Sequence, residues 1–322
     1  MIFCMVILGG LTRLTESGLS MTEWRPVFGW LPPLDDQAWQ RIFEMYKKTP
    51  QFQKIFPDLT LDGFKAIFWF EYLHRLLGRL IGAVFLVGFV YQLLRRRISR
   101  ALMPQLVLLF VLGGLQGALG WYMVASGLVD RPSVSHYRLA AHLSLAILLF
   151  AWVIWILSGS RGRLTSSFGR AQPARKLAVV AYGTLAATIV FGAFVAGLDA
   201  GKIYNTFPTM GGDWIPADYF RSGFALADIV ANPVAVQFNH RVLAILTFVL
   251  IAVLWWRSLK GNALLTKGSA SFLLFAIVLQ AALGIATLLL IVPVWLAAIH
   301  QAGAMLVVTA AVMDARRRFG SG

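Results

Sequence analysis

The chain has 322 residues, of which 58% are hydrophobic and only 13% are charged, and its formal net charge is +15. Soluble domains have about a quarter of their residues charged, so this composition excludes an ordinary soluble protein. The single cysteine, Cys4, excludes an internal disulfide and any CxxC metal or redox motif.

Seven apolar runs are long enough to cross a bilayer, which takes about 20 residues of helix. The first apolar stretch, residues 1–11, is too short to span and lacks the features of a signal peptide. We expect it to be the outer half of a truncated first helix. The sequence therefore predicts an all-α integral membrane protein with eight transmembrane helices. The seven full-length runs are residues 72–94, 103–125, 139–157, 177–198, 238–256, 271–292 and 294–313.

The basic residues are concentrated in short segments between these runs. Fifteen Lys and Arg lie in residues 95–100, 161–176, 257–267 and 316–318. A basic excess in short loops marks the cytoplasmic side of a membrane protein. We therefore expect both termini in the cytoplasm and the two long loops, residues 15–70 and 199–237, outside. This topology accounts for the net charge, and no nucleic-acid motif is present.

The first long loop contains one amphipathic pattern. Trp39, Ile42, Phe43 and Tyr46 have helical spacing, which predicts a helix lying on the outer membrane surface.

Three sequence elements occur twice in the same order, which indicates two similar halves. They are a His-Arg pair, a Gln-x-Ala-Leu-Gly motif and a single His. We predict two pseudo-symmetric four-helix bundles, residues 1–158 and 177–322, joined by a cytoplasmic linker over residues 159–176. Since each half has four spans, the repeat axis should run along the membrane normal. The elements are His74-Arg75, residues 116–120 and His142, then His240-Arg241, residues 280–284 and His300.

Four of the five histidines are expected in the first turns of even-numbered helices, at the outer end. His74 and His142 form one pair, and His240 and His300 form the other. Histidines that face one another across a bundle core can supply both axial ligands of a haem iron. A helix–helix hydrogen bond would explain one such residue, whereas two symmetric pairs favour ligands. The fifth, His136, is expected on the surface of a loop.

The residue four positions after each of these histidines is small. A flat macrocycle bound through an imidazole lies close to the backbone, and a large side chain on the same helix face would block it. This favours haem over a bare metal ion, although small residues are also common in membrane helices. The four residues are Gly78, Ala146, Ala244 and Ala304.

An arginine follows the first histidine of each pair. Arg75 and Arg241 are placed to bind haem propionates in the fork geometry that Arg makes with carboxylates. The alternative is an interfacial arginine that extends to lipid headgroups.

The two halves differ three residues before the first histidine. Glu71 stands in the first half and Gln237 in the second. A carboxylate can take up a proton or stabilise positive charge, and an amide cannot. We therefore assign the N-terminal half to substrate and the C-terminal half to a permanent haem. The alternative for Glu71 is a purely structural ion pair with Arg75.

With these residues the chain resembles the haem A synthase family in its mitochondrial and alphaproteobacterial form. The resemblance covers nearly the whole chain and rests on five motifs, in residues 9–20, 71–75, 137–143, 205–210 and 238–241. It implies an oxidoreductase that oxidises a methyl group of haem O to a formyl group, giving haem A for cytochrome oxidase assembly. It also implies a bacterial inner-membrane location and a haem O synthase as partner, and it is compatible with a homo-oligomer.

The same resemblance implies the roles of the site residues. Haem b would be bound by His240 and His300 and would relay electrons, while haem O would be held by His74 and His142. Glu71 would be the catalytic carboxylate. Two alternatives remain at this point: an electron carrier with two permanent haems b, and a transporter built from parallel repeats. The position of the prolines, mainly in loops and at helix ends, speaks against a transporter.

Overall fold

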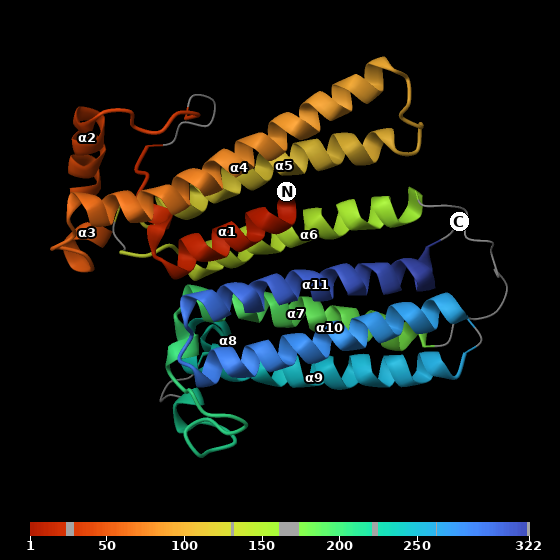
Figure 1. Cartoon of the computed structure of the whole chain (residues 1–322). Coiled ribbons are helices and arrows are strands. Elements are labelled where there is room, and N and C mark those ends of the chain that lie inside the picture. The colour runs from red at the N-terminus through yellow and green to blue at the C-terminus, as the bar shows by residue number, and fades with distance from the viewer. Residues whose placement is uncertain (24–28, 130–131, 161–173, 221–224, 262, 321–322) are drawn as a thin grey trace. The chain divides into compact units, whose positions relative to one another are not determined.

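The computed structural model describes residues 1–23, 29–129, 132–160, 174–220, 225–261 and 263–320, and every regular element in them is helical (Figure 1). Seven of these helices are long and apolar enough to cross a membrane, so the chain is a multi-pass membrane protein. They are α4 (Leu61–Leu94), α5 (Met103–Ala125), α6 (His136–Ser160), α7 (Arg175–Gly197), α9 (Pro233–Leu259), α10 (Leu264–Leu289) and α11 (Val294–Phe319).

The remaining helices are short. The helix α1 (Ile2–Leu14) is apolar but has only 13 residues. The other short elements are η1 (Ser17–Leu19), α2 (Asp36–Lys47), α3 (Pro50–Lys54), η2 (Ala200–Lys202), η3 (Ala217–Tyr219) and α8 (Asp228–Ala231).

The helix α4 begins eleven residues earlier than the predicted span. The hydroxyl of Thr60 caps its first turn by accepting a hydrogen bond from the Gly63 amide at 3.2 Å. The added turns include the charged residues Asp62 and Lys65, so hydropathy alone did not predict that they belong to the helix. His74 therefore lies well inside its helix, and the prediction that it stands in the first two turns is wrong. His136 is the first residue of α6, not a loop residue.

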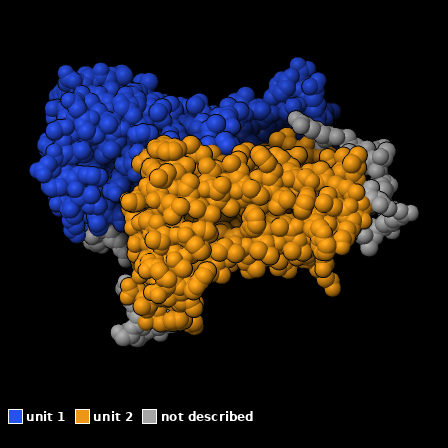
Figure 2. Space-filling view, turned by 60° about the horizontal axis from the view of Figure 1, so that its bottom comes forward, with its two compact units in different colours: residues 1–149 blue, residues 150–322 orange. Residues whose placement is uncertain are grey.

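The chain divides into two compact units, residues 1–149 and 150–322, which are coloured separately in Figure 2. The boundary falls within α6. The linker predicted over residues 159–176 lies mostly outside the described residues, because residues 161–173 are not among them.

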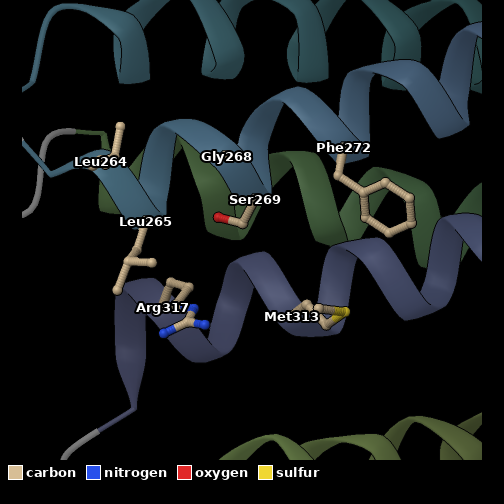
Figure 3. A pocket seen from close by; sticks show the side chains of 7 residues that line it. All are labelled: Leu264, Leu265, Gly268, Ser269, Phe272, Met313 and Arg317. Carbon is tan, nitrogen blue, oxygen red and sulfur yellow. The ribbon is translucent and has the colours of Figure 1, made fainter. Parts of the chain in front are cut away.

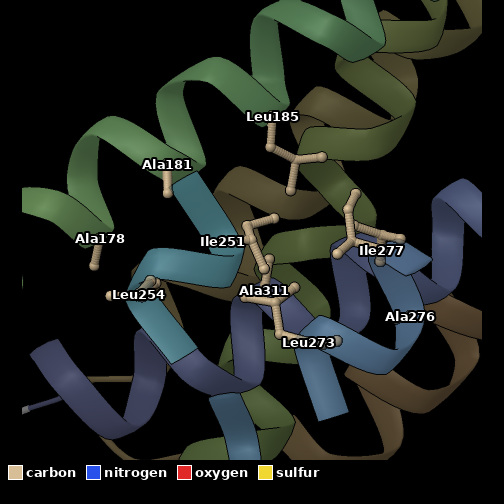
Figure 4. Packing of buried hydrophobic residues seen from close by; sticks show 11 residues of the cluster. Ala178, Ala181, Leu185, Ile251, Leu254, Leu273, Ala276, Ile277 and Ala311 are labelled. Carbon is tan, nitrogen blue, oxygen red and sulfur yellow. The ribbon is translucent and has the colours of Figure 1, made fainter. Parts of the chain in front are cut away.

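The helices α7, α9, α10 and α11 of the second unit form a closed bundle. Each packs against the next, and α11 returns to α7. Figure 4 shows the apolar core that fills this bundle. Ala178 and Ala181 of α7 and Ala310 of α11 are fully buried, and such small residues let membrane helices approach closely.

A buried ion pair ties the four helices of this bundle together. Asp314 and Arg318 of α11 are 0% and 1% exposed, and Arg318 Nε donates to Asp314 Oδ2 at 2.7 Å. Tyr182 of α7 and Ser269 of α10 donate to the same carboxylate at 2.5 and 2.6 Å. Arg318 Nη2 donates to Ser258 Oγ of α9 at 2.7 Å. Both charges are therefore paired and hydrogen-bonded, as buried charges must be.

The first unit has much less buried surface in its membrane helices. None of the most apolar window of α4 is buried and only 11% of that of α5, against 22% for α7, α9 and α10 and 44% for α11. The main aromatic cluster lies instead where α2 packs on the first turns of α4. Trp39 and Phe43 of α2 contact Phe68 and Phe64 at centroid distances of 4.9 and 5.1 Å. The predicted amphipathic helix is present, and its apolar face is covered by α4.

A hydrogen-bond chain joins this outer helical region to the end of α1. Tyr46 Oη donates to Gln51 Oε1 at 3.0 Å, and Gln51 Nε2 donates to the carbonyl of Glu16 at 2.9 Å. Burial raises the pKa of Tyr46, and the nearby Glu16 charge raises it further. The phenol therefore remains a neutral donor at any physiological pH.

Replacing Arg318 by Met should destabilise the second unit by about 3–5 kcal/mol, because it leaves the Asp314 carboxylate buried without its cation. The double variant Asp314→Asn/Arg318→Met should recover most of this loss. Thermal unfolding in detergent, followed by size-exclusion chromatography, measures both. Equal melting temperatures for the wild type and Arg318→Met would contradict the role of Arg318 as the buried cation that compensates Asp314.

Candidate functional site

The four predicted ligand histidines lie on four different membrane helices. His74 on α4 and His142 on α6 belong to the first unit, and His240 on α9 and His300 on α11 belong to the second. All four side chains are half-buried. Each unit thus contains one of the two predicted pairs of imidazoles.

His142 and His300 each lie against a glycine of the preceding helix. A methyl group built on Gly120 of α5 would stand 2.9 Å from Cε1 of His142. A methyl group on Gly284 of α10 would stand 2.9 Å from Cε1 of His300. Both distances are too short for real carbon atoms, so any larger residue would force the ring to move.

His74 and His240 have the same kind of neighbour. A methyl group on Gly9 of α1 would lie 3.1 Å from Nε2 of His74, and one on Gly192 of α7 would lie 3.1 Å from Cε1 of His240. All four imidazoles therefore rest on the bare backbone of an adjacent helix. The glycines at these positions are required by the close approach of a ring, not by helix propensity, which disfavours glycine.

The glutamine of each Gln-x-Ala-Leu-Gly motif contacts the same histidine as the glycine. Gln116 Nε2 lies 3.2 Å from Nδ1 of His142 and donates to the His142 carbonyl at 2.9 Å. Gln280 Nε2 lies 3.5 Å from Nε2 of His300. Residues four apart share a helix face, which explains why the motif spaces its glutamine and glycine in this way.

Sequence reasoning found this repeat but assigned it no role. The spacing of four between Gln and Gly was the signal that both residues face one neighbour. The partner could not be read from the sequence, because it lies on the next helix.

A backbone carbonyl orients His240. Its Nδ1 lies 3.0 Å from the carbonyl oxygen of Thr188 on α7. A carbonyl only accepts hydrogen bonds, so Nδ1 must carry the proton. This leaves Nε2 as the unprotonated nitrogen, which is the arrangement that haem and metal ligation requires.

The donor sets fit a haem held from two sides better than a bare ion. The described part of the chain contains no group of three or more His, Cys, Asp or Glu that could hold a metal ion. It does contain one of the predicted histidine pairs in each unit, His74 and His142 in the first and His240 and His300 in the second. In the second unit, Nδ1 of His300 and Oε1 of Gln280 are buried without a hydrogen-bond partner among the described residues.

Glu71 forms a buried ion pair with Arg75 on the next turn of α4. Arg75 Nε donates to Glu71 Oε1 at 2.5 Å, and the two side chains are only 10% and 5% exposed. The other guanidinium nitrogens donate to the carbonyls of Glu23 and Met21, each at 3.0 Å. Arg75 therefore holds both the carboxylate and the segment that follows η1.

Arg241 holds the corresponding segment of the second unit. It donates to the carbonyls of Tyr204 and Thr206, each at 2.7 Å. Gln237, which stands where the first unit has Glu71, donates to Tyr204 from Nε2 at 3.0 Å. A carboxylate could not make this bond, so the amide has a structural use here. Binding of haem propionates by the two arginines stays a prediction.

The small residues four positions after the histidines have different surroundings. A methyl group on Gly78 would lie 3.3 Å from Cε of Met5 on α1. Gly78 therefore faces a neighbouring helix. Ala146, Ala244 and Ala304 are half-buried.

Comparison with known proteins places the whole chain in one family. Residues 1–312 match the COX15-CtaA family, described as cytochrome oxidase assembly protein. The chain belongs to this family. No solved structure matches it.

Members of the cytochrome oxidase assembly family with similar sequences are named haem A synthase. The Parvibaculum lavamentivorans protein is 47% identical over 98% of this chain and 91% of its own length. The Paramagnetospirillum magneticum protein is 47% identical over 96% and 88%. The Caulobacter vibrioides protein is 43% identical over 98% and 92%. The similarity therefore includes every histidine-bearing helix.

Replacing Gly192 by Val should push the His240 ring out of place and lower haem affinity by about tenfold or more, as loss of ligand orientation does in metal sites. Haem per folded chain, determined as the pyridine haemochrome after size-exclusion chromatography, measures this.

The matched control is Gly183→Val on the same helix, where an added methyl group meets nothing within 4 Å. It should retain wild-type haem. Equal haem content in the two variants would show that the ring does not depend on Gly192.

Proposed function

We propose that this chain is a haem A synthase, an oxidoreductase that converts a methyl group of haem O to the formyl group of haem A. One observation carries the proposal. Each unit holds a pair of histidines resting on glycines, within a chain 43–47% identical over nearly its full length to proteins named haem A synthase. The reaction replaces two C–H bonds of the methyl carbon with one C=O bond, so it needs, besides this chain, an oxygen donor and an oxidant that takes up four electrons in total.

In the proposed arrangement the second unit holds haem b between His240 and His300. A haem with two histidine ligands supplies one-electron transfer. The closed bundle of α7, α9, α10 and α11 supports this assignment, because a packed core holds ligands in fixed positions. The Thr188 carbonyl keeps the proton on Nδ1 of His240 and so presents Nε2 as the ligand.

The first unit is the proposed substrate site, with haem O between His74 and His142. The low burial of α4 and α5 at membrane depth supports this assignment. These helix surfaces are apolar and accessible from the lipid, so the long hydrophobic tail of haem O can lie against them. A substrate must also enter and leave, which a closed bundle would hinder.

Glu71 is the proposed catalytic carboxylate. It precedes His74 by almost one helical turn, so the two side chains lie on the same face of α4. Arg75 fixes the carboxylate through Oε1. In that position it can accept a proton as the methyl group is oxidised. Gln237 cannot accept a proton in this way, which is why the second unit is assigned no chemistry.

The proposed topology has eight membrane helices, with α1 as the first, and two halves related by pseudo-symmetry. The recurrence of the glycine and glutamine contacts around His142 and His300 supports it. The basic segments favour cytoplasmic termini, and the similarity to bacterial proteins favours a bacterial inner membrane. A haem O synthase would supply the substrate.

Product analysis tests the proposed activity. Co-expression with a haem O synthase in a host that lacks haem A should give extractable haem A. Both Glu71→Gln and His74→Ala should reduce it to background. The control Glu44→Gln changes an exposed glutamate of α2 and should leave the yield unchanged. Two haems b per folded chain without haem A would instead identify an electron carrier.

The assignment of the two units predicts a separation of spectra and activity. His300→Ala should lose both the haem b absorption and haem A formation. His74→Ala should lose haem A formation and keep the haem b absorption, because its ligand pair lies in the other unit. Reduced-minus-oxidised spectra of the two purified variants measure this. Loss of haem b in His74→Ala and retention in His300→Ala would reverse the assignment.

A further inference from the structure

A groove of about 450 Å³ lies between α10 and α11, where α10 begins and α11 ends (Figure 3). It belongs to the second unit, at the end of the bundle that carries the buried Asp314–Arg318 pair. It is lined by Leu264, Leu265, Gly268, Ser269 and Phe272 of α10 and by Met313 and Arg317 of α11.

Most of this lining is apolar and exposed. Leu265 is 53% exposed, Phe272 43% and Met313 40%. An added methyl group at Gly268 would meet nothing within 4 Å, so this glycine forms an open stretch of the groove. From Leu264 to Phe272 the wall extends over about two helical turns. Such a surface accommodates a hydrocarbon chain.

Arg317 is the one charged residue among those that line the groove. Its Nη1 atom is buried and has no hydrogen-bond partner among the described residues. The acid nearest to it in sequence, Asp314, is already bonded by Arg318, Tyr182 and Ser269. The charge of Arg317 is therefore not compensated by that carboxylate and favours an anion.

The sequence around the groove adds further positive charge. Lys267 adjoins Gly268 on α10, and Arg316 adjoins Arg317 on α11. Lys260 follows the preceding helix and is exposed. A basic pocket between membrane helices on the side with the positive loops is a typical site for anionic lipid headgroups.

We propose that this groove binds an anionic phospholipid, with its phosphate on Arg317 and an acyl chain along Gly268, Phe272 and Met313. Guanidinium groups bind phosphates through two parallel hydrogen bonds, which would supply the missing partner of Nη1. The apolar wall distinguishes a lipid from free phosphate, and the arginine distinguishes an anionic from a zwitterionic lipid. The proposal does not depend on the proposed enzymatic function.

Binding at this place should stabilise the second unit. Ser269 lines the groove and also donates to Asp314, whose hydrogen bonds reach α7 and α11. A lipid that bridges α10 and α11 therefore holds the same end of the bundle. Any ligand that binds only the folded state raises the melting temperature.

Thermal unfolding of the purified full-length chain, delipidated in detergent and then titrated with lipid, tests the proposal. Phosphatidylglycerol should raise the melting temperature, and phosphatidylcholine with the same acyl chains should not. Arg317→Gln should weaken the phosphatidylglycerol effect by about fivefold in half-saturating concentration. The control Arg257→Gln changes an exposed arginine outside the groove and should behave as the wild type.

A second variant tests the apolar part of the site. Gly268→Leu fills the open stretch without changing charge, so it should lower the amount of phosphatidylglycerol that co-purifies, measured by mass spectrometry. Its size-exclusion profile and its melting temperature without added lipid should match the wild type, which shows that the chain is folded.

Three outcomes would overturn the proposal. One is an equal response to phosphatidylcholine, which would mean that the groove takes any hydrocarbon chain. Another is an equal response to inorganic phosphate alone, which would mean that the apolar wall is not used. The third is an equal weakening of the phosphatidylglycerol effect in Arg257→Gln and Arg317→Gln, which would mean that the lipid responds to the general surface charge and not to Arg317.

Discussion

The packing of an imidazole ring onto the bare backbone of the next helix is the contact on which the arrangement of the site depends. At Gly9, Gly120, Gly192 and Gly284 even one methyl group would press against a histidine. A ring held this closely fixes both the distance between two helices and the direction in which its nitrogens point. Glutamine amides and the Thr188 carbonyl then set the hydrogen bonding of the rings. Helix packing and the orientation of the imidazole rings are therefore one constraint in this protein.

The two units use this contact in different surroundings. The second unit closes its bundle around an apolar core and a fully paired ionic cluster. The first unit leaves the apolar parts of α4 and α5 almost unburied. The proposed assignment of the resident haem to the second unit and of the substrate to the first rests on this difference. The two units also differ at Glu71 and Gln237, and the Gln237 amide donates to the Tyr204 carbonyl, which a carboxylate could not do.

The two arginines beside the histidines both donate hydrogen bonds to backbone outside their own helices. Arg75 and Arg241 both donate to carbonyls of the segments that follow the preceding helix. Donors that are removed from water need such partners. The segments are thus held over the histidine-bearing helices by side chains that come from those helices. Arg75 differs only in that it also binds a carboxylate.

The sequence by itself determined the membrane class, the positions of seven spanning helices and the repeated order of histidines. A bilayer requires long apolar helices, so these properties can be predicted from the order of residues in the sequence. Only the tertiary structure decided that α4 extends beyond its apolar part, because Phe64 and Phe68 pack on α2. It also decided the donor role of Gln237 and the glycine beneath each imidazole. These contacts join residues on different helices or segments, and the distance between such residues depends on tertiary packing, which a local sequence pattern does not contain.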